Sequence, residues 1–325
     1  MIRLRLGTRG SRLARAQSTW VADRLREKSP ELTIESIPIE TFGDAHRDAL
    51  LAPELGPSFF TKEIEEALLA GRVDLAVHSC KDLATTLPEG LTLAAIPARE
   101  DARDVLVSRA GGLADLPAGA RVGTCSPRRR GFLASLRPDL VAVDLRGNVP
   151  TRVRAVDEGR VDAAILAAAG LLRLGMADRV AETLDPSAMV PAAAQGALAL
   201  QTRADDDATT ALVRLLEDAT SRAEVTAERA CLRRLEAGCQ APVGALARVS
   251  GDTLSFDAAL VTPAGVVRAR ASGPIAAAEA TGRTAAEKLL SQLGLESLRG
   301  VPWAGPSPEA PSGGAAAANA RVRRS

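Results

Sequence analysis

Two stretches of this chain repeat the same order of local signals, and this repetition constrains the fold more than any other sequence feature. The first begins as an alternating strand, turns at residues 7–11 (Gly-Thr-Arg-Gly-Ser) and continues with apolar residues at helical spacing. The second has a strand, a Gly-Thr turn at 123–124, and a helix for which we expect Ser126 as N-cap and Pro127 as first residue. The two turns lie 123 − 7 = 116 residues apart.

A second repeated signal supports the first. The tetrapeptide Gly-Arg-Val-Asp occurs at 71–74 and 159–162, each time after a predicted helix and before an apolar strand. Such alternation of strands and helices indicates two α/β lobes, each with a mostly parallel, doubly wound sheet. Sheets of this kind bind ligands beyond the carboxyl ends of their strands, and both Gly-Thr turns are predicted to lie there.

The pattern changes from about residue 219. We predict a helix that Gly238 ends, three short strands with turns at 250–252 and 263–265, and a closing helix over 274–294. This region is typical of a small α+β third domain. The residues after Trp303 are rich in Pro, Gly, Ala and Ser, and we expect a disordered tail.

Composition excludes several classes of function. The net charge is +1 and there are five Phe, two Trp and no Tyr, so we expect neither a nucleic acid nor a membrane as partner. The four cysteines show no CxxC spacing and there are only two histidines, which argues against a metal site and a serine triad. Without an apolar N-terminal segment, we expect a cytoplasmic protein with reduced thiols.

Arginine is concentrated in one stretch. Residues 121–154 hold eight arginines and two acids, a local charge of 8 − 2 = +6. Arg128 and Arg129 fall in the first turn of a predicted helix, where the helix dipole disfavours cations, so we expect a bound anion to balance them. Arg9 occupies the matching turn of the first lobe, and Arg146 and Arg152 follow the next predicted strand. Any one of these could be a solvated surface charge, but the set at strand ends indicates a site for carboxylates.

Three further residues are candidates for chemistry. Asp82 and Lys81 directly follow the apolar strand that ends at His78, where an acid could stabilise a cation, although a turn-forming role is the alternative. Cys239 lies on a loop just after a predicted helix and could be a reactive thiol, whereas a lone cysteine is more often a small buried residue. We expect His78 to be a structural histidine whose hydrogen bonds are satisfied.

Taken in order, the segments GTRGSRLARAQ, FTKEIEEALLAGRVDLAVHSCKD, VGTCSPRR, LRGNVPTR, DAAILAAAGLLRLG, PAAAQGALAL and AERACLRRLEAGCQAPVG closely resemble the porphobilinogen deaminase (hydroxymethylbilane synthase) family of tetrapyrrole and heme biosynthesis. They span about residues 4–244. Single motifs of this set are weakly specific, but the ordered set is highly specific.

The resemblance implies a fold and a reaction. It implies two lobes like those of periplasmic binding proteins and a third domain, in a monomeric transferase. Four porphobilinogen molecules would be joined head to tail with loss of ammonia to give hydroxymethylbilane. The primer would be a dipyrromethane cofactor held by a thioether on Cys239. Asp82 matches the catalytic aspartate, whose carboxylate would stabilise the cationic azafulvene left when ammonia departs.

The resemblance also assigns residues that bind the carboxylate side chains of substrate and cofactor: Arg9, Ser11, Lys62, Lys81, Thr124, Ser126, Arg128, Arg129, Arg146, Arg152, Arg173 and Gln195. Some positions depart from the family's usual pattern. The first of two lysines near Lys62 is missing, and Ala194 stands where glycine is frequent, which predicts altered loop rigidity without loss of function.

The predicted division of the chain is domain 1 at 1–98 and 194–216, domain 2 at 99–193, domain 3 at 217–303 and a tail at 304–325. Two alternatives stay open from the residues alone. A two-lobed solute-binding or ligand-sensing protein without catalysis would show the same repeat. A transferase acting on phosphates is less favoured, because neither Gly-Thr turn has Walker spacing.

Overall fold

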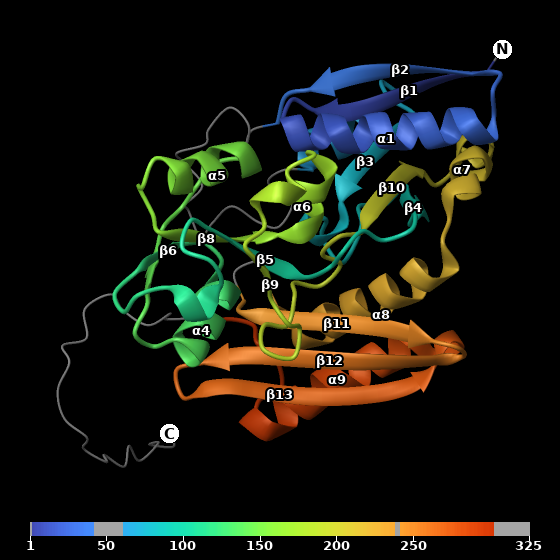
Figure 1. Cartoon of the computed structure of the whole chain (residues 1–325). Coiled ribbons are helices and arrows are strands. Elements are labelled where there is room, and N and C mark those ends of the chain that lie inside the picture. Colours follow the sequence, from blue (N-terminus) through green and yellow to red (C-terminus); the bar gives the residue numbers. More distant parts are fainter. Residues whose placement is uncertain (1, 42–60, 238–240, 302–325) are drawn as a thin grey trace.

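The computed structural model describes residues 2–41, 61–237 and 241–301, which build three sheets (Figure 1). The first sheet has the strand order β2-β1-β3-β10-β4. Its strands are β1 (Ile2–Arg9), β2 (Leu32–Ile39), β3 (Leu75–Ser79), β4 (Leu91–Ala95) and β10 (Leu198–Arg203), and its helices are α1 (Arg12–Lys28), α3 (Lys62–Leu69) and α7 (Asp207–Val213). We call this region lobe 1.

The second sheet repeats this plan in the order β7-β6-β8-β5-β9. Its strands are β5 (Asp104–Ser108), β6 (Arg121–Gly123), β7 (Val141–Val143), β8 (Ala163–Ala167) and β9 (Glu182–Thr183), and its helices are α4 (Pro127–Leu136), α5 (Val149–Asp157) and α6 (Ala168–Arg173). We call this region lobe 2. In both sheets the first three strands are parallel and the fourth is antiparallel to its neighbours, so each sheet is mixed.

The register of the two sheets confirms the internal repeat. Leu6 pairs with Leu75 in lobe 1, and Val122 pairs with Ala163 in lobe 2, which matches the sequence offsets of 122 − 6 = 116 and 163 − 75 = 88. The aspartate of each Gly-Arg-Val-Asp motif accepts a hydrogen bond from a backbone N–H on the neighbouring strand: Arg5 to Asp74 at 2.9 Å and Arg121 to Asp162 at 2.6 Å. Equivalent positions in the two lobes can therefore be compared residue by residue.

The two lobes exchange strands. The chain leaves lobe 1 after β4 and enters lobe 2 as β5, then returns after β9 to become the antiparallel strand β10 of lobe 1. The two crossover segments lie against each other, and the N–H of Glu100 donates to the carbonyl oxygen of Gly196. The domain limits stay a prediction, because strand pairing does not fix where each domain ends.

The third region consists of β11 (Val243–Ser250), β12 (Thr253–Thr262) and β13 (Gly265–Pro274) in an antiparallel sheet, together with α8 (Ala219–Leu235) and α9 (Ala278–Leu293). The two helices pack closely, since a Cβ added to Gly282 would lie 1.9 Å from the carbonyl oxygen of Ala227. Phe256, Leu260 and Leu289 are among the buried residues between sheet and helices. The predicted fold class, two doubly wound α/β lobes and a small α+β domain, is confirmed.

Two predicted boundaries were wrong. Strand β1 continues through Gly7 and Thr8 to Arg9, because it pairs with β2 along its whole length, so the turn is confined to residues 10–11. Helix α8 ends at Leu235, and the residue with left-handed conformation is Glu236 (φ 52°). Gly238, predicted to end this helix, lies outside the described residues, as does the predicted tail. No helix in the described ranges combines the length and the apolar character needed to cross a membrane.

Candidate active site

A small pocket of lobe 1 lies between the β1–α1 turn and the end of β3. Its volume is about 80 Å³, and it is lined by Arg9, Ser11, Leu13, Ala14, Gln17, Thr61, Val77, His78, Ser79 and Asp82. The Ser11 side chain accepts a hydrogen bond from the N–H of Ala14 and caps α1. Asp82 ends a single turn of 3₁₀-helix, Cys80–Asp82, that follows β3 directly. The structure thus brings Asp82 together with Arg9 and Ser11, as the resemblance implied.

The matching turn of lobe 2 is organised around a buried carboxylate. Ser126 caps α4 by accepting from the N–H of Arg129, and Pro127 is the first helical residue, both as predicted. Arg128 and Arg129 are 4% and 6% exposed, so they are not surface charges. Arg128 donates to Asp104 at 2.6 Å, and Arg129 donates to the same carboxylate at 2.7 and 3.1 Å.

Asp104 therefore corrects one expectation about these arginines. An internal carboxylate at the start of β5 supplies one counter-charge in the first turn of α4, so a bound anion would have to offset only the one positive charge that remains. Burial alone would raise the pKa of Asp104, but Arg128 and Arg129 outweigh burial and hold this pKa far below its usual range. Asp104 was not among the site residues predicted from the sequence. The one signal that could have found it is an acid that opens an otherwise apolar strand, DVLVS.

Gln195 links the two crossover segments to these charges. Its side-chain amide donates to the Ala102 carbonyl at 2.8 Å and to Asp104 at 2.9 Å. Its oxygen lies 3.4 Å from the Lys81 ammonium and 3.5 Å from the Arg129 guanidinium. Burial lowers the pKa of Lys81 and the nearby Arg129 adds to this effect, while Asp82 opposes it. Because Lys81 is also exposed to solvent, water offsets part of the lowering.

Arg152 and Arg173 of lobe 2 approach the same region. Arg152 donates to the Gly147 carbonyl at 2.7 Å; burial and the nearby Arg129 lower its pKa, while Asp82 raises it. Arg173 donates to the carbonyl of Gly196 at 2.7 Å, and burial lowers its pKa to about 10. Within the described part of the chain, both guanidinium groups donate to carbonyl oxygens rather than to carboxylates, which suits them to bind the carboxylates of a ligand.

Other predicted binding residues stand apart from this group. Lys62 is exposed and forms an ion pair with Glu66 of the same helix, at 3.9 Å. Thr124 is buried and its hydroxyl accepts from the N–H of Ser126, so it shapes the turn. Arg146 is half-buried and follows β7, with no contact among the described residues that joins it to Asp82. Cys239 lies outside the described residues.

The remaining arginines of the 121–154 stretch include two that pair with nearby acids on the surface. Arg130 lies 2.5 Å from Asp144, and Arg137 lies 2.6 Å from Asp139. These ion pairs are partly exposed and are of the kind that contributes little to stability. For them the surface-charge interpretation holds.

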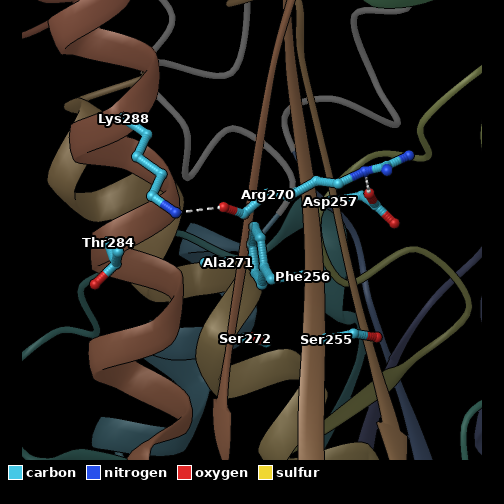
Figure 2. Close-up of a pocket in the computed structure, with 8 residues that line it drawn as sticks. All are labelled: Ser255, Phe256, Asp257, Arg270, Ala271, Ser272, Thr284 and Lys288. Carbon is cyan, nitrogen blue, oxygen red and sulfur yellow. Dashed lines mark hydrogen bonds and ion pairs between the residues drawn. The ribbon is translucent and has the colours of Figure 1, made fainter.

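A second pocket lies in the third domain. It has a volume of about 500 Å³ and is lined by residues of β12, β13 and α9 (Figure 2). The Lys288 ammonium donates to the Arg270 carbonyl at 2.8 Å, and the Arg270 guanidinium donates to Asp257 at 3.0 Å. Unlike the lobe 1 pocket, this one is not lined by Asp82, Arg9 or Ser11.

Comparisons with known proteins place the chain in a family. Residues 4–211 match the family model "Porphobilinogen deaminase, dipyromethane cofactor binding domain", and residues 222–291 match "Porphobilinogen deaminase, C-terminal domain". The porphobilinogen deaminase of Desulforudis audaxviator is 48% identical over 288 residues, covering 88% of this chain and 93% of that protein. That of Deinococcus radiodurans is 46% identical over 302 residues, covering 91% and 98%.

Among solved structures, the methionine binding protein MetQ matches 66% of this chain and 89% of its own, at 12% identity and a TM-score of 0.44. So distant a likeness adds nothing to the fold derived from strand order. The two family models and the full-length relatives instead agree with the order of the sequence motifs. The chain belongs to the porphobilinogen deaminase family.

Proposed function

We propose that this chain is a transferase that joins four porphobilinogen molecules head to tail, releases ammonia and yields hydroxymethylbilane. The single observation that carries the proposal is a group of cations from both lobes around one acid. Lys81 is adjacent to Asp82 on lobe 1, and Arg152 of lobe 2 is close enough to Asp82 for the two charges to interact. A substrate with carboxylates on one edge and a developing positive charge on the other matches this arrangement.

The cofactor of the family is a dipyrromethane, two linked pyrrole rings that carry four carboxylates, and the residues present fit such a group. Lys81, Arg152 and Arg173 offer cations to it, while Asp104 fixes Arg128 and Arg129 behind them. We assign its attachment to Cys239, which follows α8 in the sequence. When bound, the group supplies a covalently held ring end onto which substrate can be added.

The chain's own residues supply binding, orientation and charge. Asp82 holds a carboxylate where positive charge develops as ammonia leaves the substrate, and a fixed carboxylate costs no reorganisation at that moment. Arg9 and Ser11 line the pocket beside Asp82, where they can bind carboxylate side chains of a pyrrole. We extend the same role to Lys62, Thr124, Ser126, Arg146 and Gln195 from the family resemblance.

The direct test is to incubate the purified protein with porphobilinogen and to measure ammonia and bilane. We expect both products in a ratio of four ammonia to one bilane. Intact mass spectrometry of the active protein should show a mass excess of two pyrrole units, which the Cys239→Ala variant lacks. Active protein with the mass of the bare chain would disprove the cofactor assignment, and porphobilinogen left unchanged would disprove the function.

We also propose that the protein works as a monomer in the cytoplasm, without a nucleic acid or membrane partner. The near-zero net charge supports the last point. Cys80, Cys125 and Cys231 are free thiols, as expected in a reducing compartment. Light scattering of the purified protein would show a mass well above 33.7 kDa if the monomer were wrong.

A further inference from the structure

Lobe 1 contains a buried chain of polar side chains that the proposed function does not use. His78 on β3, Gln201 on β10 and Glu65 on α3 are 4%, 0% and 4% exposed. The Gln201 amide nitrogen donates to Glu65 at 3.0 Å, and the Gln201 oxygen lies 3.0 Å from Nε2 of His78. The Thr61 hydroxyl donates to the other oxygen of Glu65. Burying such groups costs free energy, which their hydrogen bonds only partly return.

The repeat shows that the fold does not need these polar groups. With the offset of 88 residues, His78 corresponds to Leu166 and Glu65 corresponds to Val153 in lobe 2. Gln201 pairs with Ala76 on β3, and Val107 pairs with the equivalent Ala164 on β8.

The three lobe 2 residues, Leu166, Val153 and Val107, are buried together in one apolar cluster. The same architecture is therefore filled by hydrocarbon in one lobe and by a polar chain in the other. This difference points to a role for the polar chain beyond packing.

The hydrogen bonds fix which nitrogen of His78 carries the proton. Because the Gln201 nitrogen donates to Glu65, its oxygen faces Nε2, so Nε2 must be the N–H donor. Burial lowers the pKa of His78 to about 4, so the ring is neutral near pH 7. In a neutral imidazole with its proton on Nε2, Nδ1 carries a free lone pair and can only accept a hydrogen bond.

His78 lines the pocket beside Asp82, where we infer that this lone pair is open to a ligand. Nδ1 has no hydrogen-bond partner among the described residues. It is not fully enclosed by protein atoms either. His78 lines the 80 Å³ pocket together with Asp82, Arg9 and Ser11. The pocket thus has acceptors at the β3 end and donors at the β1–α1 turn.

We propose that His78 is a substrate-binding residue whose Nδ1 accepts a hydrogen bond from the pyrrole N–H of a ring held beside Asp82. A pyrrole with carboxylate side chains presents its N–H on one edge and its carboxylates on the opposite edge, as the pocket requires. Glu65 and Gln201 are positioning residues that keep the required tautomer. The inference rests on the proposed function and adds a contact to the same site.

Nitrogen NMR of the intact, cofactor-loaded protein tests the contact directly. The chain has only two histidines, His46 and His78, so the ring-nitrogen spectrum is simple and a His46→Asn variant assigns it. The probe is a pyrrole with acetate and propionate side chains but no aminomethyl group, so no ammonia can leave. We expect the Nδ1 resonance of His78 to move upfield at saturation, with binding followed by calorimetry. The N-methyl form of the same pyrrole should leave it unmoved.

A variant that copies lobe 2 gives a second, independent measurement. The triple change Glu65→Val, His78→Leu and Gln201→Val installs the apolar set that lobe 2 already packs, so it should melt no lower than wild type. Loss of one hydrogen bond should raise KM for porphobilinogen about tenfold. The preference for the N–H pyrrole over its N-methyl form should fall by a similar factor.

The outcomes separate this inference from the proposed function. An unmoved Nδ1 resonance in the saturated complex, or an unchanged KM in a stable triple variant, would overturn the role of His78. In both cases wild-type protein would still release ammonia and form bilane. Failure of wild type to do so would instead overturn the proposed function.

Discussion

The strand–turn–helix units of the two lobes share a backbone plan but differ in what they hold. In both, a serine caps the helix: Ser11 for α1 and Ser126 for α4. The second and third helical residues are Leu13 and Ala14 in lobe 1, but they are arginines in lobe 2, and both pair with the one carboxylate of Asp104. A pocket lies at the turn of lobe 1, and two buried arginines follow the turn of lobe 2.

The strands beside these turns also differ in the residues that follow them. Strand β3 leads to Lys81 and Asp82, whereas β8 leads to the apolar start of α6. The polar chain behind β3 is also replaced by hydrocarbon behind β8. The comparison teaches that one fold supports two tasks. Lobe 2 holds two buried arginines on one carboxylate, and lobe 1 carries Asp82 and the pocket that we propose for the substrate.

The largest effect on stability should come from removing the carboxylate that Arg128 and Arg129 share in lobe 2. Asp104→Asn leaves Arg128 and Arg129 buried without a counter-charge, and breaking a buried ion pair in this way costs about 3–5 kcal/mol of unfolding free energy. Urea unfolding measures this loss. The control is Asp139→Asn, which breaks the partly exposed pair with Arg137 and should leave the free energy of unfolding almost unchanged.

The pH dependence gives the same test without a mutation. The pKa of Asp104 is lower in the folded protein than in the unfolded chain, so its contribution is complete at neutral pH. This contribution is lost as pH falls below the unfolded value of about 4. The acid-induced loss of stability should be smaller in Asp104→Asn than in wild type. An equal loss would mean that Asp104 does not balance the arginines.

The next largest effect should fall on turnover and come from lobe 1. Asp82→Asn removes the charge but keeps the shape, so turnover should fall by about a hundredfold or more while the melting temperature and the cofactor mass stay unchanged. Asp144→Asn, which removes an exposed acid of lobe 2, is the matched control and should keep its turnover. A purified Asp82→Asn protein with near-normal turnover would remove this acid from the mechanism.

The sequence could predict the repeated units because they depend on local signals. Ser126 before Pro127 indicates a helix start, and the alternation of strands and helices indicates the lobes. The counter-charge at Asp104 could not be predicted, because its partners are more than twenty residues away and come together only when β5 enters lobe 2 from lobe 1. The tautomer of His78 could not be predicted either, because it depends on Gln201, which lies 123 residues later in the sequence.

A smaller effect, on the pH dependence of KM, should distinguish Lys81 from the permanently charged arginines of lobe 2. Because burial lowers its pKa, Lys81 loses its proton at a lower pH than a free lysine, and its attraction for carboxylates is then lost as pH rises. KM for porphobilinogen should rise up to about fivefold between neutral and alkaline pH. Lys81→Arg keeps its charge and should flatten this rise. The same alkaline rise in both proteins would assign it to another group.

The smallest effect, on thermal stability, should come from changing Ala194 in the crossover that joins the lobes. Ala194 is buried with φ 57°, and its N–H donates to Glu228 of α8, which holds this left-handed conformation. Ala194→Gly should relieve about 1–2 kcal/mol of strain, but it removes a buried methyl group worth about 0.8 kcal/mol and adds about 0.5–1 kcal/mol of chain entropy to the unfolded state. These terms nearly cancel, so thermal unfolding should change little.

Gly196, two residues later, gives the contrasting variant. It has φ 90°, and an added Cβ would lie 2.2 Å from the carbonyl oxygen of Glu100 on the other crossover, so Gly196→Ala cannot be accommodated without moving backbone. We expect a loss of about 2–3 kcal/mol, measured by the same thermal unfolding. If Ala194→Gly proved as costly as Gly196→Ala, the methyl group of Ala194 would be a packing contact that the lobes need. The packing of the Ala194 methyl group would then outweigh the strain of its left-handed backbone conformation.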